Sequence, residues 1–130
     1  MLELAEMGHA GQKRQGGKED YINHPRRIAA VFKNWFEKTL AIGHDLPEDH
    51  PEYWEIIEKE FPLKIIIGLR LLTRIEGESY FDFIMKIGES QDTSIIKVKI
   101  QDLIDNMRDL KESSKKDKYR FAYYILKNRL

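Results

Sequence analysis

The sequence contains no cysteine, and this absence excludes disulfide bonds and thiolate metal sites. A chain without cysteine suits a reducing compartment, so we expect a cytoplasmic protein. Any metal ion would have to be bound through histidine, aspartate, glutamate and water. A metal site in this chain would therefore differ from the closed, cysteine-rich zinc sites that stabilise many small folds.

The sequence also lacks a net charge. Lysine and arginine together number 22, aspartate and glutamate also number 22, and the formal net charge is zero. A bulk electrostatic attraction to nucleic acid or to an anionic membrane is not indicated, and we expect neither as a partner. Local basic clusters can still bind the phosphates of a small molecule.

Long apolar runs are missing as well. None approaches the roughly 20 residues that a membrane span requires. Residues 1–9 carry two glutamates and no lysine or arginine, so we do not expect a secretory signal there. The hydrophobic fraction of 42% is enough for a sizeable core, and a length of 130 residues suits one domain. We therefore expect a single domain that spans residues 1–130.

Apolar residues recur at helical spacing along most of the chain. The clearest example is the segment of residues 94–111. Its apolar stripe, with steps of three and four, consists of Ile96, Ile100, Leu103, Met107 and Leu110. Residues 63–67 have strand propensity, but no second strand candidate is available to pair with them, so we predict a helix. The patterns predict an all-α single domain.

Glycine, proline and charge mark the boundaries of these helices. Adjacent Gly16 and Gly17 predict a loop at residues 15–20, and Pro25 suits the first turn of a helix. Pro47 predicts that a helix ends near Leu46. The charged residues 113–118 are expected to form a solvated linker. The predicted helices span residues 2–14, 25–35, 37–46, 52–60, 63–72, 80–87, 94–111 and 119–130.

One short segment concentrates side chains that can bind a metal or transfer a proton. His44 and Asp45 are followed closely by Glu48 and Asp49. Adjacent residues on a helix point about 100° apart, so His44 and Asp45 can meet one ion only in a groove between helices. Further ligands must then come from other parts of the chain.

Two other residues are candidates for this role. His24 precedes the helix that is predicted from Pro25, and Asp102 lies in the middle of the amphipathic segment. Imidazole and carboxylate ligands suit Mn²⁺, Fe²⁺ or Zn²⁺. A set of two histidines and two aspartates leaves positions open for water and substrate, where the ion can polarise a phosphoryl oxygen.

Each of these features also has an ordinary explanation when it is taken alone. A histidine followed by an aspartate occurs by chance in many proteins, and Asp102 could be a solvated residue. Glu48 and Asp49 could form only the acidic first turn of a helix. Arg26 and Arg27 are most simply a solvated basic face. The joint occurrence of three sequence blocks is what favours a metal site.

These blocks resemble those of the hydrolase domain of RelA/SpoT-type alarmone enzymes, within the HD superfamily. The first is HAGQKRQGGKEDYINHP at residues 9–25, which matches a pattern of His, Gly-Gln, Arg, a glycine loop and Tyr-Ile-x-His-Pro. The second is HDLPED at residues 44–49, and the third is KIQDLIDNMR at residues 99–108. They occur in the family's order and extend over most of the chain.

The resemblance implies a role for each matched residue. One divalent ion, with Mn²⁺ favoured and Zn²⁺ or Fe²⁺ as alternatives, would be bound by His24, His44, Asp45 and Asp102. The attacking water would be handled by Glu48 and Asp49. The nucleotide would be bound by Arg14, which stacks on the base, and by Asn106 and Arg108. His9 is not a ligand in this pattern, and we expect it to support the site or the fold.

The resemblance also implies a fold and a reaction. The fold would be an HD-type helical bundle, in a small form that stands alone. The reaction would be removal of the 3′-pyrophosphate from guanosine 3′,5′-bis(diphosphate), with release of pyrophosphate. The alternatives are an HD-type nucleotidase or phosphatase that acts on another nucleotide, and a nucleotide-binding module without turnover. The sequence does not indicate an oligomeric state.

The chain departs from the family pattern near the expected nucleotide. Gln15 stands where the family often has lysine, and Asp20 stands where it has proline. Asp105 replaces a usual histidine, and His50 replaces a usual threonine. The pair Leu46-Pro47 replaces two aliphatic residues. None of these changes removes a proposed metal ligand. They weaken the resemblance at the positions where the nucleotide is expected to bind, and so bear on which nucleotide is the substrate.

Overall fold

Every regular element in the computed structural model is a helix, within the residues that it describes, which are 1–14, 16–108 and 110–130. An isolated antiparallel bridge joins Lys13 to Asp20. The prediction of an all-α domain is confirmed. In chain order the elements are α1 (Leu2–Gly8), α2 (Asn23–Ala30), α3 (Trp35–Gly43), α4 (Leu46–Asp49), the 3₁₀ helix η1 (Pro51–Tyr53), α5 (Trp54–Glu60), α6 (Leu63–Leu71), α7 (Tyr80–Glu89), α8 (Thr93–Arg108) and α9 (Ser114–Lys127).

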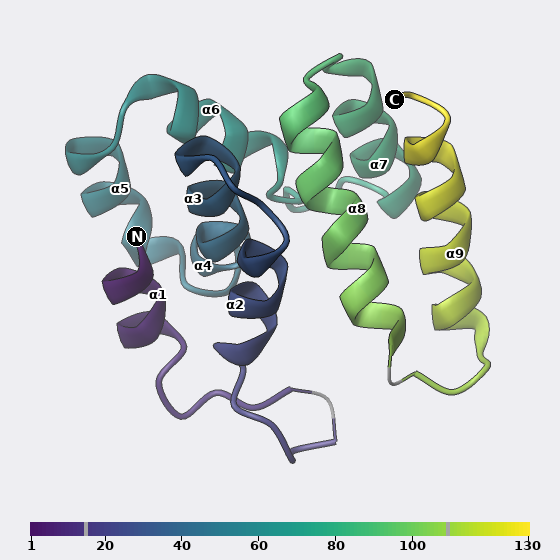
Figure 1. Cartoon of the computed structure of the whole chain (residues 1–130), viewed down its shortest axis with the longest axis horizontal. Coiled ribbons are helices and arrows are strands. Elements are labelled where there is room, and N and C mark those ends of the chain that lie inside the picture. The colour runs from purple at the N-terminus through teal and green to yellow at the C-terminus, as the bar shows by residue number, and fades with distance from the viewer. Residues whose placement is uncertain (15, 109) are drawn as a thin grey trace.

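Helix α8 joins the two sides of the molecule. On one side it packs against α2 and α3, and on the other side it packs against α7 and α9. Figure 1 shows α8 between these two groups, with α1 and α5 on the outer side of α2 and α3. Across the described ranges, no helix has the length and apolarity needed to cross a bilayer.

The central position of α8 explains its burial. Ile96, Ile100 and Leu103 of the predicted apolar stripe are buried, with exposed fractions of 4% or less. Val98 on another face of the helix is also fully buried. Because α8 is covered from more than one direction, polar side chains on it can also be removed from water.

The first predicted helix, at residues 2–14, is too long. Helix α1 ends at Gly8, and Gly11 adopts a φ of 77°. That conformation is left-handed, which glycine adopts without steric cost and which ends a right-handed helix. The chain then runs through a loop that contains Arg14, and the loop reaches α2 at Asn23.

The boundary between the next two helices was also predicted wrongly. Helix α2 ends at Ala30 instead of residue 35, and Trp35 begins α3. Asn34 caps α3, because its side chain accepts a hydrogen bond from the backbone N–H of Glu37 at 2.8 Å. An asparagine cap satisfies one of the free N–H groups of a first helical turn, and this signal outweighed the apolar spacing of Trp35.

Two further boundaries differ from the prediction. Helix α3 ends at Gly43 instead of residue 46, and Pro47 lies in the first turn of the separate helix α4. The charged residues 113–118 are not a linker, because Ser113 caps α9 and its hydroxyl accepts from the N–H of Lys116. The first turn of a solvated helix has the same polar composition as a loop, so only the capping hydrogen bond of Ser113 distinguishes the two.

We expect Leu103→Ala to lower the free energy of unfolding by about 2–5 kcal/mol, because it opens a cavity in a fully buried part of α8. Urea unfolding followed by circular dichroism measures this change. The matched control is Ile104→Ala, one position along the same helix, where the side chain is 42% exposed. It should cost less than about 1 kcal/mol. Equal losses in the two variants would contradict the described packing of α8.

Candidate metal centre

The structure brings His24, His44, Asp45 and Asp102 together. One nitrogen or carboxylate oxygen from each residue lies within 4.8 Å of the others, and the group can hold a metal ion. His24 comes from the first turn of α2, His44 and Asp45 lie between α3 and α4, and Asp102 lies on α8. The four side chains therefore converge from three separate segments of the chain.

A break in the helix lets two neighbouring residues face the same point. Helix α3 ends at Gly43 and α4 begins at Leu46, so His44 and Asp45 lie between two helices. The Nε2 atom of His44 is 3.0 Å from the Oδ2 atom of Asp45. In one continuous helix the two side chains would diverge by about 100°. The early end of α3 is therefore a condition for this site.

Hydrogen bonds fix the orientation of both imidazole rings. Nδ1 of His24 donates to Oδ2 of Asp105 at 2.6 Å, and Nδ1 of His44 donates to the carbonyl oxygen of Ala41 at 2.7 Å. A carboxylate and a carbonyl only accept, so each Nδ1 carries the proton. In the neutral ring the lone pair is then on Nε2, and both Nε2 atoms face the centre.

The atoms that face the centre require a proton or a metal ion between them. Nε2 of His24 is 2.9 Å from Oδ1 of Asp102, and Nε2 of His44 is 3.2 Å from the same oxygen. A lone pair against a carboxylate oxygen is repulsive unless a proton or a metal ion lies between them. Burial lowers the pKa of His44, but the charges of Asp45 and Asp102 outweigh burial and raise it well above the ordinary value. The donor set therefore fits a divalent cation.

Two residues that were not expected at the site each donate a hydrogen bond to one of its carboxylates. Nζ of the buried Lys99 donates to Oδ2 of Asp102 at 2.7 Å, and the hydroxyl of Tyr21 donates to Oδ2 of Asp45. Burial raises the pKa of Asp102, but Lys99 and His44 hold it well below its usual range. Both residues lie within the blocks that carry the resemblance. The spacing of three between Lys99 and Asp102 places them on the same face of a helix, which could have predicted their ion pair.

Glu48 and Asp49 lie on α4, directly after the ligand pair. Oε2 of Glu48 accepts from the backbone N–H of Arg74 at 3.4 Å, and Oδ2 of Asp49 accepts from Nε2 of Gln12 at 3.0 Å. Glu48 is exposed as a residue, but partial desolvation of its carboxylate and the charge of Asp45 raise its pKa to about 7 in the metal-free protein. Desolvation also raises the pKa of Asp49. Both groups can therefore accept a proton more readily than a solvated carboxylate.

A hydrogen-bond network orients the amide of Gln12. Its Oε1 accepts from Nδ1 of His9 at 2.7 Å and from Nε2 of His50 at 3.0 Å. With the oxygen occupied by two ring N–H groups, the amide nitrogen of Gln12 is directed at Asp49. His9 itself is buried, and it acts on the site through Gln12.

The three residues expected to bind a nucleotide lie at different depths. Nη1 of Arg14 donates to Oδ1 of Asn106 at 3.1 Å, and Nδ2 of Asn106 donates to Oδ1 of Asp102 at 3.1 Å. Arg14 and Asn106 are thus connected to the centre. Arg108 is at the edge, where it pairs with Glu19 at 3.5 Å and has a 44% exposed side chain. Gln15 lies outside the described residues, so its departure from the pattern has no structural account.

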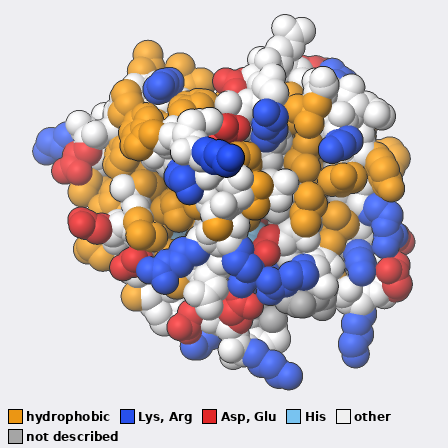
Figure 2. Space-filling model, in the orientation of Figure 1, with side chains coloured by type: hydrophobic (Ala, Val, Ile, Leu, Met, Phe, Trp, Pro, Cys, Tyr) orange, Lys and Arg blue, Asp and Glu red, His pale blue; other side chains and the backbone are white. Residues whose placement is uncertain are grey.

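Arginine side chains with acidic partners surround this end of the molecule. Figure 2 shows lysine and arginine side chains gathered across the lower part of one face, over the lower ends of α2 and α8, with acidic side chains between them. Arg27 is not on a freely solvated face, contrary to expectation, because it forms a forked ion pair with Asp105. Asp105 and Arg27 are therefore further members of the site.

Comparisons with known proteins agree with the resemblance of the three blocks. No family model matches the chain. The chain is 30% identical to GTP pyrophosphokinase rsh of Brucella ovis and of Brucella abortus, over 78% of this chain and 15% of each relative. It is 29% identical to the putative GTP diphosphokinase RSH1, chloroplastic, of Oryza sativa subsp. japonica, over 96% of this chain and 16% of that relative. The chain thus spans about one sixth of the length of these relatives, and it is similar to a segment of enzymes named for GTP.

Glu48→Gln should stabilise the metal-free protein at neutral and higher pH. The ordinary pKa of this carboxyl group is 4.5, and folding raises it to about 7. A raised pKa means that the folded state favours the protonated acid, so ionisation costs stability as pH rises from 4.5 towards 7. Glutamine escapes this cost. The variant and the natural protein should be equally stable near the lower pH, and the variant should be more stable above the higher one.

Urea unfolding in the presence of a chelator, repeated across this pH range, measures the difference. Glu55→Gln, at an exposed position on α5, controls for the loss of one charge. A difference between Glu48→Gln and the natural protein that does not change with pH would contradict the raised pKa.

Proposed function

We propose that this chain is a metal-dependent phosphohydrolase domain of the HD type, and that it removes pyrophosphate from a guanosine nucleotide with a 3′-pyrophosphate. The observation that carries the proposal is the convergence of His24, His44, Asp45 and Asp102, with donor atoms within 4.8 Å of one another. The all-helical fold and the similarity to rsh proteins support it. We further propose that residues 1–130 form one domain.

The proposed ion is Mn²⁺, bound by Nε2 of both histidines and by one carboxylate oxygen of each aspartate. Mixed imidazole and carboxylate ligands suit Mn²⁺, Fe²⁺ or Zn²⁺, and the resemblance favours the first. When bound, the ion would polarise a phosphoryl oxygen and lower the pKa of water. The hydrogen bonds from His24 to Asp105 and from His44 to Ala41 keep both rings turned toward that position.

Glu48 is the proposed general base. A base is most effective when its pKa lies near the working pH, and partial desolvation of the Glu48 carboxylate raises its pKa towards that range. Its position on α4, three residues after Asp45, supports an action on water next to the metal. Asp49, which accepts a hydrogen bond from Gln12, would orient the same water.

Arg14, Asn106 and Arg108 are the proposed nucleotide ligands. The flat guanidinium of Arg14 can stack on a purine, and its contacts with Asn106 and the Tyr21 ring hold it beside the centre. Arg108, at the edge, can offset the charge of a phosphate. Asn106 connects Arg14 to Asp102, so nucleotide and metal would be held by one face of α8.

A substrate panel tests the reaction. With Mn²⁺ we expect release of pyrophosphate from ppGpp and pppGpp, and no comparable release of phosphate from deoxynucleoside monophosphates or NADPH. Glu48→Gln should lower kcat by about 10²–10⁴ while it retains Mn²⁺, because it removes only the base. Asp102→Ala should lose Mn²⁺ binding, and Glu55→Gln should behave as the natural protein.

The other outcomes separate the alternatives. If the protein turned over only another nucleotide, that nucleotide would take the place of ppGpp in the proposal, and the proposed metal centre would still stand. Binding of Mn²⁺ without turnover of any panel member would indicate a nucleotide-binding module. A natural protein that does not bind Mn²⁺ would contradict the metal centre itself.

Arg14→Ala should raise the KM for ppGpp by about 2- to 30-fold, with a much smaller effect on kcat, because a cation over a ring contributes about 0.5–2 kcal/mol. Arg14→Lys should also raise KM, since lysine keeps the charge but loses the plane that stacks. Steady-state kinetics provide both numbers. Arg26→Ala, which removes a surface arginine paired with Glu6, is the control. An unchanged KM in Arg14→Lys would rule out stacking.

A further inference from the structure

We infer that Asp105 is a positioning residue that sets the metal affinity of the centre through His24. The inference rests on the proposed metal site. Asp105 is not one of the four converging donors, and it lies on the far side of the His24 ring from them. It would act by holding the ring of His24 in one orientation and with one proton position.

The contacts of Asp105 leave it little freedom. Its Oδ2 accepts from Nδ1 of His24 at 2.6 Å and from Nη2 of Arg27 at 2.8 Å, and its Oδ1 accepts from Nε of Arg27 at 2.8 Å. The forked pair with a guanidinium fixes the plane of the carboxylate. The group facing His24 is thus a fixed anion.

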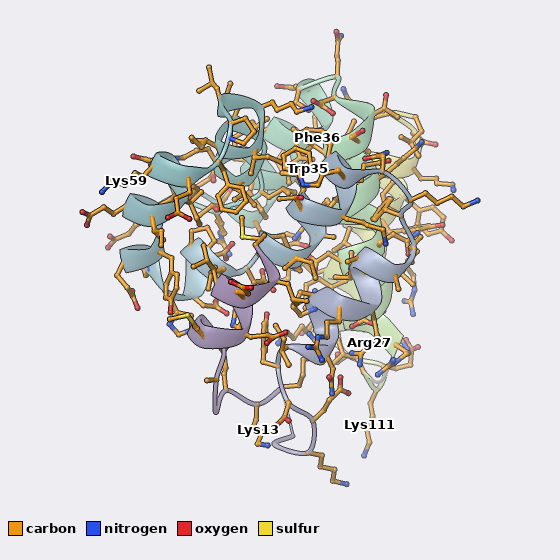
Figure 3. All side chains as sticks on the ribbon, turned by 60° about the vertical axis from the view of Figure 1, so that its left-hand side comes forward. Lys13, Arg27, Trp35, Phe36, Lys59 and Lys111 are labelled. Atoms are coloured by element: carbon orange, nitrogen blue, oxygen red, sulfur yellow. The ribbon has the colours of Figure 1, made fainter. Side chains whose placement is uncertain are left out.

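The fork is itself anchored in the loop before α2. Arg27 also donates to Glu19, and Arg108 lies 3.5 Å from the same glutamate. Figure 3 shows Arg27 and Lys13 toward the same, lower side of the molecule, and Trp35 and Phe36 toward the upper side. The anion is therefore held from two elements besides its own helix, α2 and the loop.

The two imidazoles of the centre are supported in different ways. His44 donates to the backbone carbonyl of Ala41, which no side-chain substitution removes. His24 donates to a carboxylate, which a single substitution can change. A carboxylate behind a ligand imidazole fixes the Nδ1–H tautomer and makes Nε2 a stronger donor, and loss of such a partner typically weakens metal binding by about 10- to 100-fold. Of the two imidazole supports, the one at residue 105 is therefore the one that a side-chain substitution can adjust.

The alternative role for Asp105 is purely structural, as the counter-charge of Arg27. The two roles make different predictions. A structural role alters the free energy of unfolding and leaves the Kd for Mn²⁺ unchanged in the folded protein. A positioning role alters Kd in the folded protein and changes the state of the His24 ring.

The first test is the Kd for Mn²⁺, measured by electron paramagnetic resonance of the free ion at fixed pH, on variants that circular dichroism shows to be folded. Asp105→Asn keeps an acceptor oxygen but loses the charge, and Asp105→Ala loses both. We expect Kd to rise about 10-fold in the first and towards 100-fold in the second. Arg27→Gln removes the forked ion pair but leaves the weaker contacts of Asp105 with Arg14 and Arg108, and it should give a smaller rise. Asp117→Asn, in an exposed ion pair on α9, is the matched control and should change nothing.

The second test reads the ring directly. In the Zn²⁺-loaded natural protein, proton NMR should show two hydrogen-bonded Nδ1–H signals, one from His24 and one from His44. Asp105→Ala should lose the His24 signal and keep that of His44, which serves as an internal control because its acceptor is Ala41. A retained His24 signal with an unchanged Kd would overturn the inference.

The outcomes separate this inference from the proposed metal site. If the natural protein binds no Mn²⁺, the metal site fails and the inference fails with it. If the natural protein binds Mn²⁺ and the Asp105 variants bind it equally well, only the inference fails. Should Asp105→Ala not fold, Asp105→Asn and Arg27→Gln decide, and an unchanged Kd in both would overturn the positioning role.

Discussion

The rest of the structure depends on the meeting of two carboxylates with two buried imidazoles where α2, α3, α4 and α8 come together. Asp45 and Asp102 place negative charge in a poorly hydrated position, which costs several kcal/mol for each ion unless partners compensate. Lys99 and Tyr21 each compensate one carboxylate. The imidazole Nε2 atoms face the remaining carboxylate oxygens, so a proton or a metal ion between them stabilises the centre.

The helices are arranged as this centre requires. Helix α8 is buried on several faces, so it can present Asp102 to the centre and Asp105 to the back of the His24 ring. The end of α3 at Gly43 allows two consecutive residues to face one ion. The loop after α1 brings Arg14 to Asn106 on the same helix. The proposed metal and nucleotide residues thus meet at one central helix, α8, which contacts both histidines and Arg14.

Much of this could be predicted from sequence, for physical reasons that can be named. The apolar steps of α8 predicted its burial, since the helical period is fixed by backbone geometry. The helix boundaries at Ala30, Trp35 and Ser114 were predicted wrongly, because capping by Asn34 and Ser113 competes with apolar spacing and depends on local backbone angles. The sequence indicates His24 and Asp102 as candidate ligands. The distance of 2.9 Å between Nε2 of His24 and Oδ1 of Asp102 follows from the packing of α2 on α8.

The sequence by itself determined the helical class and the donor chemistry. Without cysteine, any metal ligands had to be nitrogen and oxygen donors, and the three sequence blocks selected His24, His44, Asp45 and Asp102 among them. The apolar spacing favoured helices over strands. The tertiary structure alone decided which groups support these ligands. From the sequence, Asp105 is only a departure from a family pattern, and Arg27 is expected to be a solvated residue. Their contacts join residues up to 81 positions apart, and no local spacing specifies which side chain will lie behind a distant imidazole once the helices have packed.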